Sequence, residues 1–286
     1  MTLLLLLACQ TIDLADEWDL DRLRLLAVRA DPAEPRPGDT VTFTSLGYAP
    51  EGAWTAIWFA CVAGTEMGCS FDAALLEGVD DLESMTPEEQ AELIAALQAA
   101  GLIGVQPGFE PSWVVPEDAL TGLSEDEALE GTSATVQITL TTASADEEGD
   151  TELVLRRIPI SLAPTPNINP DIGTFEVDGA GLPAGEGLTA SAGQAYELTA
   201  LLYGELEEYA YVTTEGVEEM RTEELEWRWY TDMGSFAPSF SIGDDEPNWD
   251  GVSWTAPNEP GSGVLHAVVL DGRGGMGWWT VAVTVE

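Results

Sequence analysis

Runs of β-branched and aromatic residues that alternate with polar ones are the feature that most constrains this fold. The segments ATVQITLTT (134–142) and GWWTVAVTV (277–285) place apolar side chains on every second residue, which is the period of a half-buried β-strand. Similar runs recur between turns rich in Gly, Pro, Asn and Asp, at 23–30, 40–45, 54–62, 151–162, 172–179, 195–203, 226–232, 251–257 and 263–271. Many short strands separated by such turns predict an all-β protein.

The length of 286 residues favours two domains. The segment SLAPTPNINPD (161–171) contains three prolines and two asparagines, a composition that predicts an extended linker with little hydrogen bonding. We therefore expect a first domain at 23–162, a Pro-rich linker at 163–171 and a second domain at 172–286.

One stretch of the first domain breaks the β pattern and predicts a helical insertion at about 84–130. In SMTPEEQAELIAALQAAGLIG, Thr86 is a favourable N-cap, Pro87 fits the first helical position and Glu89 completes a capping box. Gly101 is a plausible helix stop, and a shorter helical turn is expected at 124–129. The apolar stripe of the longer helix can cover a sheet edge or core opening, or it can bind a partner.

Two stretches resemble immunoglobulin-like domains of bacterial proteins. The first, LRLLAVRADPAEPRPGDTVTFTSLG, is similar to the opening of such domains, and LEWRWYTDMGSF followed by WTAPNEPGSGVLHAVVLDGRGG is similar to the end of PKD-like domains. The resemblance implies two Ig-like β-sandwiches in tandem that act as spacers or adhesion modules. In the DGRGG turn, Asp271 is expected to cap the backbone, and Gly272, Gly274 and Gly275 suit positive φ angles.

The chain opens with MTLLLLLACQ, whose apolar run is too short for a transmembrane helix of about 20 residues. A buried strand or a plain secretory signal is possible, but Leu6-Leu7-Ala8-Cys9 resembles a bacterial lipobox. That resemblance implies cleavage before Cys9 and a diacylglycerol thioether on its sulfur. The acyl chains would anchor the protein in a membrane.

The lipobox resemblance sets further expectations for export. Residues 1–8 would be the remnant of a signal peptide, and residues 9–22 an acidic tether. Because Gln10 is not the aspartate that retains Gram-negative lipoproteins in the inner membrane, the resemblance points to the outer membrane. A signal peptide should begin with a basic region, and Met1-Thr2 has none; we therefore expect translation to begin upstream.

Cys61 and Cys69 lie eight positions apart, on either side of a Gly-containing loop. An exported protein permits a disulfide between them. A metal pair or free core thiols are the alternatives, although two cysteines without nearby histidines make a poor zinc site.

Charge is extreme, because nine arginines oppose 52 carboxylates and no lysine is present, which gives a net charge of −43. Such a surface repels nucleic acid, so a nucleic-acid-binding role is excluded. Two acidic loops could supply oxygen ligands for calcium, although neither has EF-hand spacing and solvated turns are the simpler interpretation. Their candidate ligands are Asp146, Glu148 and Asp150 in the first loop, and Asp244, Asp245 and Asp250 in the second.

Little in the sequence points to catalysis. The chain has one histidine, His266, within an apolar strand, and it has no G-x-S-x-G, P-loop, HExxH or GxGxxG motif. We therefore predict a non-enzymatic, envelope-anchored lipoprotein with a structural, adhesion or protein-binding role and an unknown envelope partner. An acid-catalysed hydrolase is a remote alternative.

Tryptophans of the second domain support another alternative, a carbohydrate-binding accessory lipoprotein. Strand alternation puts Trp227 and Trp229 on one face and puts Trp278 and Trp279 on opposite faces. Exposed rings of this kind stack on sugars or on a protein partner, whereas the competing interpretation is core packing.

Overall fold

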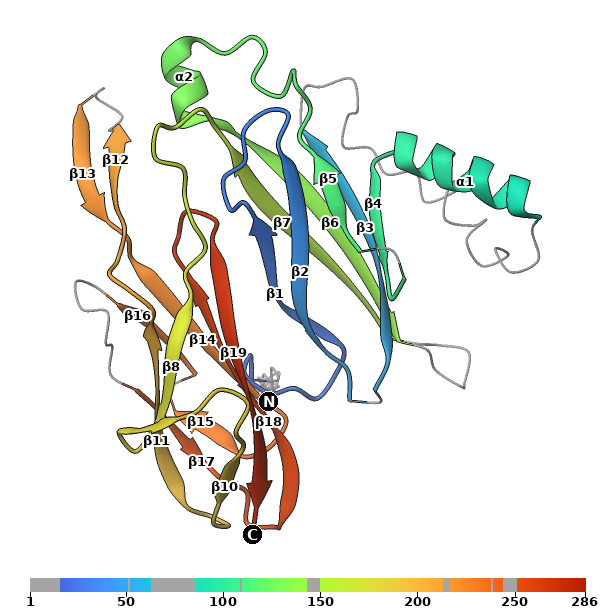
Figure 1. The fold of residues 1–286 in the computed structure, drawn as a ribbon. Coiled ribbons are helices and arrows are strands. Elements are labelled where there is room, and N and C mark those ends of the chain that lie inside the picture. Colours follow the sequence, from blue (N-terminus) through green and yellow to red (C-terminus); the bar gives the residue numbers. More distant parts are fainter. Residues whose placement is uncertain are drawn as a thin grey trace, which may run out of the picture.

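The computed structural model describes residues 16–50, 52–62, 86–108, 110–142, 150–212, 217–237, 239–243 and 251–286. These residues form an all-β protein with two sandwiches, as predicted (Figure 1). In the first sandwich the strands are β1 (Arg24–Asp31), β2 (Thr40–Tyr48), β3 (Trp54–Val62), β4 (Leu102–Gln106), β5 (Ser112–Val114), β6 (Thr132–Thr142) and β7 (Thr151–Ile160).

The first sandwich packs a three-stranded sheet, β1-β2-β5, against a four-stranded sheet, β4-β3-β6-β7. Alternate residues of β2 and β6 point inward, so Val41, Ile138 and Leu140 are fully buried between the sheets. Trp58 on β3 lies at the centre of this core and packs against Phe43, with 5.9 Å between ring centroids. The period-2 pattern of the sequence therefore corresponds to the inner faces of the two sheets.

In the second sandwich two five-stranded sheets are present, β10-β19-β18-β14-β16 and β15-β17-β11-β8-β9. Their bounds are β8 (Ile172–Val177), β9 (Ala180–Leu182), β10 (Leu188–Ala190), β11 (Ala195–Leu202), β14 (Leu225–Thr231), β15 (Ser235–Ala237), β16 (Phe240–Gly243), β17 (Val252–Thr255), β18 (Gly261–Leu270) and β19 (Met276–Val285). Most pairs are antiparallel, but β10 pairs in parallel with the last strand, β19. Phe175, Leu198, Trp254 and Leu265 are fully buried in the core.

Both sandwiches follow the same plan, which is that of an immunoglobulin-type Greek key. In the first sandwich, the sheet β1-β2-β5 faces the sheet β4-β3-β6-β7. In the second sandwich, β8, β11 and β17 correspond to β1, β2 and β5, and β16, β14, β18 and β19 correspond to β4, β3, β6 and β7. The predicted fold class, two Ig-like β-sandwiches, follows from this strand order.

Two helices are present in the region of the expected helical insertion at about 84–130, but strands β4 and β5 lie between them and pair with β3 and β2. The insertion is therefore not continuous, because part of this region belongs to the two sheets. Helix α1 (Pro87–Ala99) has Thr86 as its N-cap and Glu89 in a capping box, and α2 (Glu125–Glu130) has a capping box from Ser124 and Glu127. Helix α1 lies against the outer face of the four-stranded sheet, where Leu97 is buried with Phe59 and Leu102 (Figure 1). The packing role expected for the apolar stripe is therefore confirmed.

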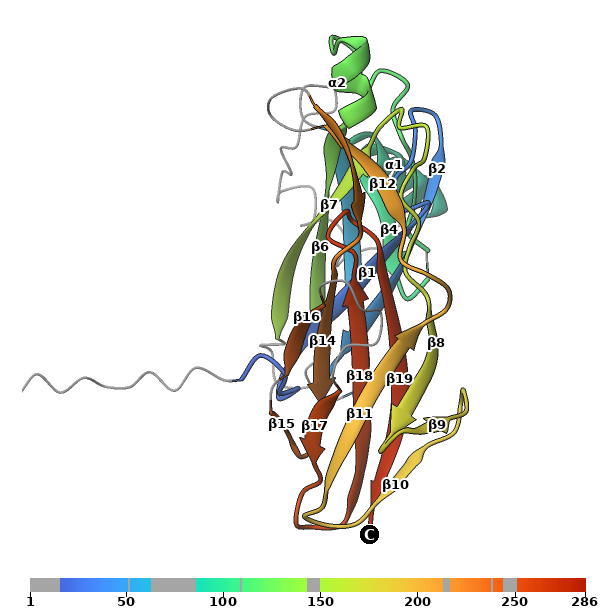
Figure 2. The ribbon, with the colours of Figure 1, turned by 90° about the vertical axis from the view of Figure 1, so that its left-hand side faces the viewer.

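The second sandwich carries an insertion of its own between β11 and β14. Strands β12 (Glu208–Val212) and β13 (Glu218–Thr222) form a separate two-stranded sheet that projects beside the first sandwich (Figure 1). Among the described residues no helix is long and apolar enough to cross a membrane. The whole body is elongated, with the C-terminus at one end (Figure 2).

Candidate functional site at the domain junction

The residues that precede β1 attach the chain to the second sandwich. The N–H of Leu20 donates to the Thr231 carbonyl oxygen and the N–H of Thr231 donates to the Trp18 carbonyl oxygen, both at 3.0 Å. The Trp18 ring meets Phe236 edge-on, with 6.1 Å between centroids, and Leu20 is buried. The predicted acidic tether over 9–22 is therefore wrong for Trp18 and Leu20, because their apolar side chains pack against β14 and its neighbours.

An apolar contact joins the two sandwiches next to this segment. Leu26 and Ala27 of β1 pack against Val268 and Met276, which lie on the outer face of the sheet containing β18 and β19. Trp278 lies beside the same cluster. Burial of this shared surface holds β1 of the first sandwich on the second.

The segment between the sandwiches adds polar contacts and departs from the expected linker with little hydrogen bonding. Asn167 donates from its backbone N–H to Glu34 Oε2 (2.7 Å) and from Nδ2 to Asp271 Oδ2 (2.8 Å). Asn169 donates to the Ala30 carbonyl oxygen (2.7 Å) and accepts from the Met276 N–H (3.0 Å). Each asparagine thus bridges a residue of the first sandwich to one of the second, a role that composition alone does not show.

The DGRGG turn between β18 and β19 shapes this junction. Asp271 Oδ1 accepts from the backbone N–H groups of Arg273, Gly274 and Gly275 at 2.8–2.9 Å, which is the capping role expected from the sequence. Gly272 and Gly274 have φ of 73° and 119°. The expected positive φ is wrong for Gly275, where a Cβ would instead lie 2.0 Å from Asp271 Oδ2. The turn therefore presents Arg273 in a fixed position.

Arg273 is the centre of an ion-pair network that links three parts of the chain. Its guanidinium pairs with Glu34 (3.4 Å) of the first sandwich, and with Glu207 (3.4 Å) and Glu223 (3.2 Å) at the base of the β12–β13 hairpin. It also lies 4.3 Å above the centroid of the Tyr209 ring. Because these contacts converge on one side chain, the hairpin base is coupled to the junction.

Glu223 is the most perturbed carboxyl of this network. Burial raises its pKa to about 7, repulsion from Asp271 and Glu207 adds to the increase, and Arg273 opposes it. Glu223 therefore titrates near neutral pH.

Two hollows lie side by side on this junction and share Glu226. The larger, about 310 Å³, is lined by Arg156, Arg157, Arg273 and the 272–275 turn. Arg156 donates to the Gly274 carbonyl oxygen (2.6 Å), and its buried Nε has no hydrogen-bond acceptor among the described residues. Burial lowers the pKa of Arg156, and nearby Asp271 opposes that shift. The hollow therefore presents guanidinium groups whose hydrogen-bond donors are only partly paired with acceptors of the described residues.

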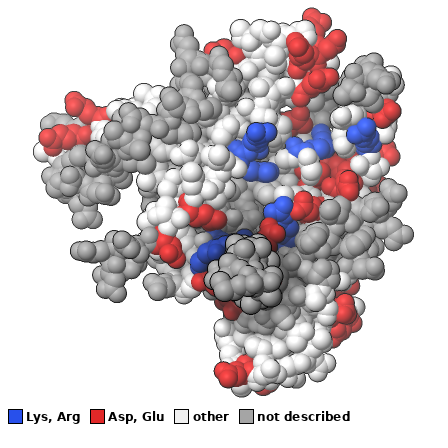
Figure 3. All heavy atoms as spheres, turned by 180° about the vertical axis from the view of Figure 1, so that it is seen from behind, with Lys and Arg blue, Asp and Glu red and all other residues white. Residues whose placement is uncertain are grey.

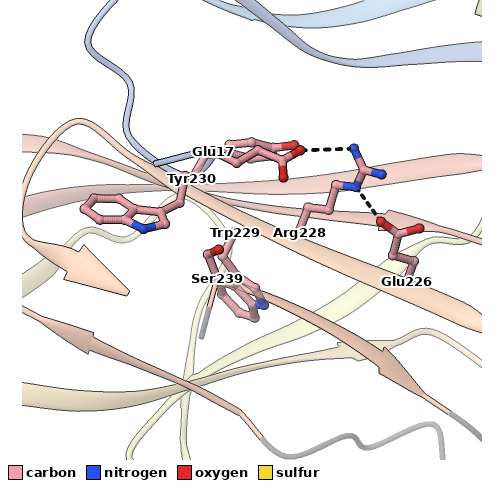
Figure 4. A pocket seen from close by; sticks show the side chains of 7 residues that line it. Glu17, Glu226, Arg228, Trp229, Tyr230 and Ser239 are labelled. Carbon is pink, nitrogen blue, oxygen red and sulfur yellow. Dashed lines mark hydrogen bonds and ion pairs between the residues drawn. The ribbon is translucent and has the colours of Figure 1, made fainter. Parts of the chain in front are cut away.

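The smaller hollow, about 200 Å³, lies beside Trp18. There the Arg228 guanidinium lies between Glu226 (2.6 Å) and Glu17 (3.7 Å), above Trp229 and Ser239 (Figure 4). Its charge is thus balanced within the hollow. Seen from behind, arginine atoms lie in several patches across the middle of this face, with Asp and Glu atoms among and around them (Figure 3).

The β12–β13 hairpin exposes apolar side chains beyond this base. Met220 is 64 % exposed and Val217 is 53 % exposed. Tyr211 is also exposed and carries the Arg221 guanidinium 3.6 Å above its ring. Tyrosine, methionine and arginine are typical of protein interfaces, so this hairpin is a candidate contact surface that the sequence reading missed.

Of the tryptophans expected to contact a sugar or a partner, two are buried and two are half-buried. Trp227 and Trp229 share a face, as predicted, but that face points into the core and both rings are buried, so the contact role is wrong for them. Trp278 and Trp279 point to opposite sides of β19, as predicted. Trp278 packs at the junction and Trp279 packs against the core of the second sandwich, so both rings serve packing.

Several candidate residues fall outside the described part of the chain. They are Cys9, Cys69, Asp146, Glu148, Asp244, Asp245 and Asp250. Cys61 is buried on β3 and Asp150 is exposed next to β7, so the disulfide and the calcium sites stay predictions. Within the described ranges, no group of three or more His, Cys, Asp or Glu residues is placed to hold a metal ion.

His266 lies on β18 and is more buried than a half-exposed strand residue. Its Nδ1 is 3.0 Å from Thr280 Oγ1. Burial lowers its pKa to about 4, so the ring is neutral at pH 7.

Comparisons with known proteins return no family model and no curated protein that matches this sequence. Among solved structures, the D00-D0 domain of Intimin aligns with 93% of this chain and 98% of its own, at 10% identity and a TM-score of 0.25. The C-terminal domain of the Streptococcus pyogenes antigen I/II-family protein AspA aligns with 93% of this chain and 100% of its own, at 10% identity and a TM-score of 0.23. Bacteroides ovatus SGBP-B, solved with a mixed-linkage heptasaccharide, aligns with 93% of this chain and 70% of its own, at 9% identity and a TM-score of 0.21. These TM-scores are too low to assign a function to this chain.

Proposed function

We propose that this protein is a non-enzymatic binding module of the cell envelope, held at a membrane by lipid on Cys9, with the β12–β13 hairpin as its contact surface. The observation that carries the proposal is the hairpin itself. It projects from the second sandwich, its base is fixed by Arg273, and it exposes Met220 and Tyr211. A surface held rigidly before binding loses little entropy when a partner docks.

The body that carries the hairpin also fits a binding module. The N-terminal segment, the apolar contact and the asparagine bridges all join the two sandwiches. Both outer edges of the two-stranded sheet are unpaired among the described strands, so a partner strand can add to either edge. We therefore favour an extended protein segment as the partner over a sugar, because Trp227 and Trp229 are buried.

The anchor is tested by the mass of the native protein. We expect a chain that begins at Cys9 and carries a diacylglycerol group, and we expect Cys9→Ala to release the protein from membranes. An unmodified Cys9 still joined to Ala8 would refute the anchor.

The contact surface is tested by photo-cross-linking in cells that produce the protein. A photoreactive residue at Met220 should give a discrete adduct of higher mass, whereas one at Thr189, exposed on β10 of the same sandwich, should not. The adduct should weaken when Arg273→Ala releases the hairpin base. Equal labelling from positions 189 and 220 would contradict the proposal.

A further inference from the structure

We infer that the anchored protein lies side-on, with the junction and strand β7 against the anionic headgroups of the membrane. The surface concerned, here called the arginine face, consists of Leu153, Leu155 and Arg157, which lie on one face of β7, and of Arg24 beside the smaller hollow. The inference rests on the proposed lipid anchor at Cys9, and three independent observations carry it.

The first observation is the position at which the N-terminal segment joins the second sandwich. Asp19 forms a bridge to Thr231, which pairs with Leu265 near the middle of β18. The described chain therefore starts on the long side of the second sandwich, whereas the C-terminus lies at one end (Figure 2). An anchor on this segment holds the molecule by its side.

The second observation is the short length of chain available. From Cys9 to Asp16 there are 16 − 9 = 7 residue steps, which span at most about 25 Å when fully extended. Strand β18 alone has ten residues and is about 30 Å long. Because the segment is shorter than the sandwich beside it, the side of the body stays near the bilayer.

The third observation is the distribution of charge. The chain has a net charge of −43, so most of its surface is repelled by anionic headgroups. Arg156 and Arg157 line the larger hollow, and Arg24 lies 5.6 Å from the centroid of Tyr230, a residue that lines the smaller one. Figure 3 shows arginine atoms across the middle of this face, with carboxylates among them. Anionic lipid repels a surface that carries these arginines less than one that carries carboxylates alone.

Two details suit the arginine face to a lipid surface. Arg157 is exposed and forms no ion pair among the described residues, and guanidinium groups bind phosphate in bidentate geometry. Leu153 and Leu155 precede it at two-residue spacing on edge strand β7 and are 59 % and 63 % exposed. An apolar pair beside arginines matches the boundary between headgroups and acyl chains.

The test measures orientation with an artificial anchor, so that it does not depend on native lipidation. A histidine tag directly before Cys9→Ser attaches the chain to vesicles that contain a nickel-chelating lipid. Energy transfer to a headgroup acceptor is then compared for donors at Leu155, at Leu123 near α2, and at Ala184 in the loop between β9 and β10. The vesicles are phosphatidylcholine with phosphatidylglycerol, or phosphatidylcholine alone.

We expect the strongest energy transfer from position 155. The lead, defined as the excess of transfer from position 155 over positions 123 and 184, should be larger on vesicles with phosphatidylglycerol than on phosphatidylcholine alone. Arg157→Glu should reduce that lead to about half, because each arginine near an anionic surface contributes to its attraction. Arg36→Glu makes the same charge change at an exposed residue that lines neither hollow and should leave the lead unchanged.

Stronger transfer from position 123 or 184 would show an end-on molecule and overturn the inference. An equal effect of the two charge reversals would overturn the role of the arginine face. Both outcomes leave the native anchor untouched, and an unmodified native Cys9 would refute the anchor without changing the orientation result.

Discussion

The two sandwiches share one strand plan and differ in what each inserts into it. The first inserts helix α1, which buries Leu97 against its own sheet. The second inserts the β12–β13 hairpin, which leaves Met220 in solvent and ties its base to the junction through Arg273. One insertion therefore completes the fold, whereas the other is fixed by the fold and left free to contact something else, which is how a common scaffold acquires a specific role.

The shared plan makes a strong prediction for the two central tryptophans. Trp58 and Trp254 are both fully buried, so replacing either by alanine should lower the free energy of unfolding by about 3–5 kcal/mol. Denaturant unfolding followed by circular dichroism measures both losses. A loss below about 1 kcal/mol at one site only would break the equivalence of the two cores.

Phenylalanine substitutions separate the two tryptophans by their hydrogen bonds. Trp254 Nε1 donates to the Met233 carbonyl oxygen (3.0 Å), whereas Trp58 Nε1 has no acceptor among the described residues. Trp254→Phe should therefore cost about 1 kcal/mol more than Trp58→Phe.

The difference between the insertions predicts unequal effects of truncation. Leu97→Ala removes a buried side chain and should cost about 2–5 kcal/mol. Met220→Ala changes an exposed side chain and should alter stability by less than about 0.5 kcal/mol, while it weakens partner contact. If Met220→Ala destabilised the fold as much as Leu97→Ala, the hairpin would be a packing element like the helix.

Glu223 predicts a smaller, pH-dependent effect at the hairpin base. Its pKa rises from the ordinary 4.5 to about 7 in the folded protein, so between these values the folded state binds more protons than the unfolded state. Its contribution is fully present below pH 4.5 and is lost as pH rises through 7. Glu223→Gln should therefore raise Tm relative to wild type at pH 8.

The gap in Tm should close as the pH falls toward 4.5, where the wild-type carboxyl is also neutral. Scanning calorimetry of both proteins from pH 4.5 to 8 measures this gap. A constant gap over the range would show that Glu223 does not titrate there. His266 supplies a contrast, because its pKa is lowered to about 4 and its contribution is lost as the pH falls from 6.5 through 4.

Long alternating strands and the capped helix could be predicted from sequence, because period and caps are local properties. Strands such as β12, EYAYV, and β13, EEMRT, could not, since each has five residues and they pair only with each other, in a separate two-stranded sheet. Alternation placed Trp227 and Trp229 on one face, but only the packing of the two sheets decides that this face is the inner one.

The junction was beyond sequence reasoning for a related reason. Its contacts join residues far apart in the chain, such as Glu34 with Arg273 and Asn167 with Asp271. Asp271 could be recognised as a turn cap, because the three backbone N–H groups that it caps lie within four residues of it. The remaining partners of the turn depend on how the two sandwiches meet, and no local pattern encodes that.

The central claim is that the junction joins both sandwiches into one rigid body that holds the hairpin in place. The most direct test is the distribution of distances between spin labels at Leu123 and Ala184, on opposite sandwiches, measured by double electron–electron resonance. We expect a single narrow distribution that broadens in Arg273→Ala. A broad or two-peaked distribution in the wild-type protein would contradict it.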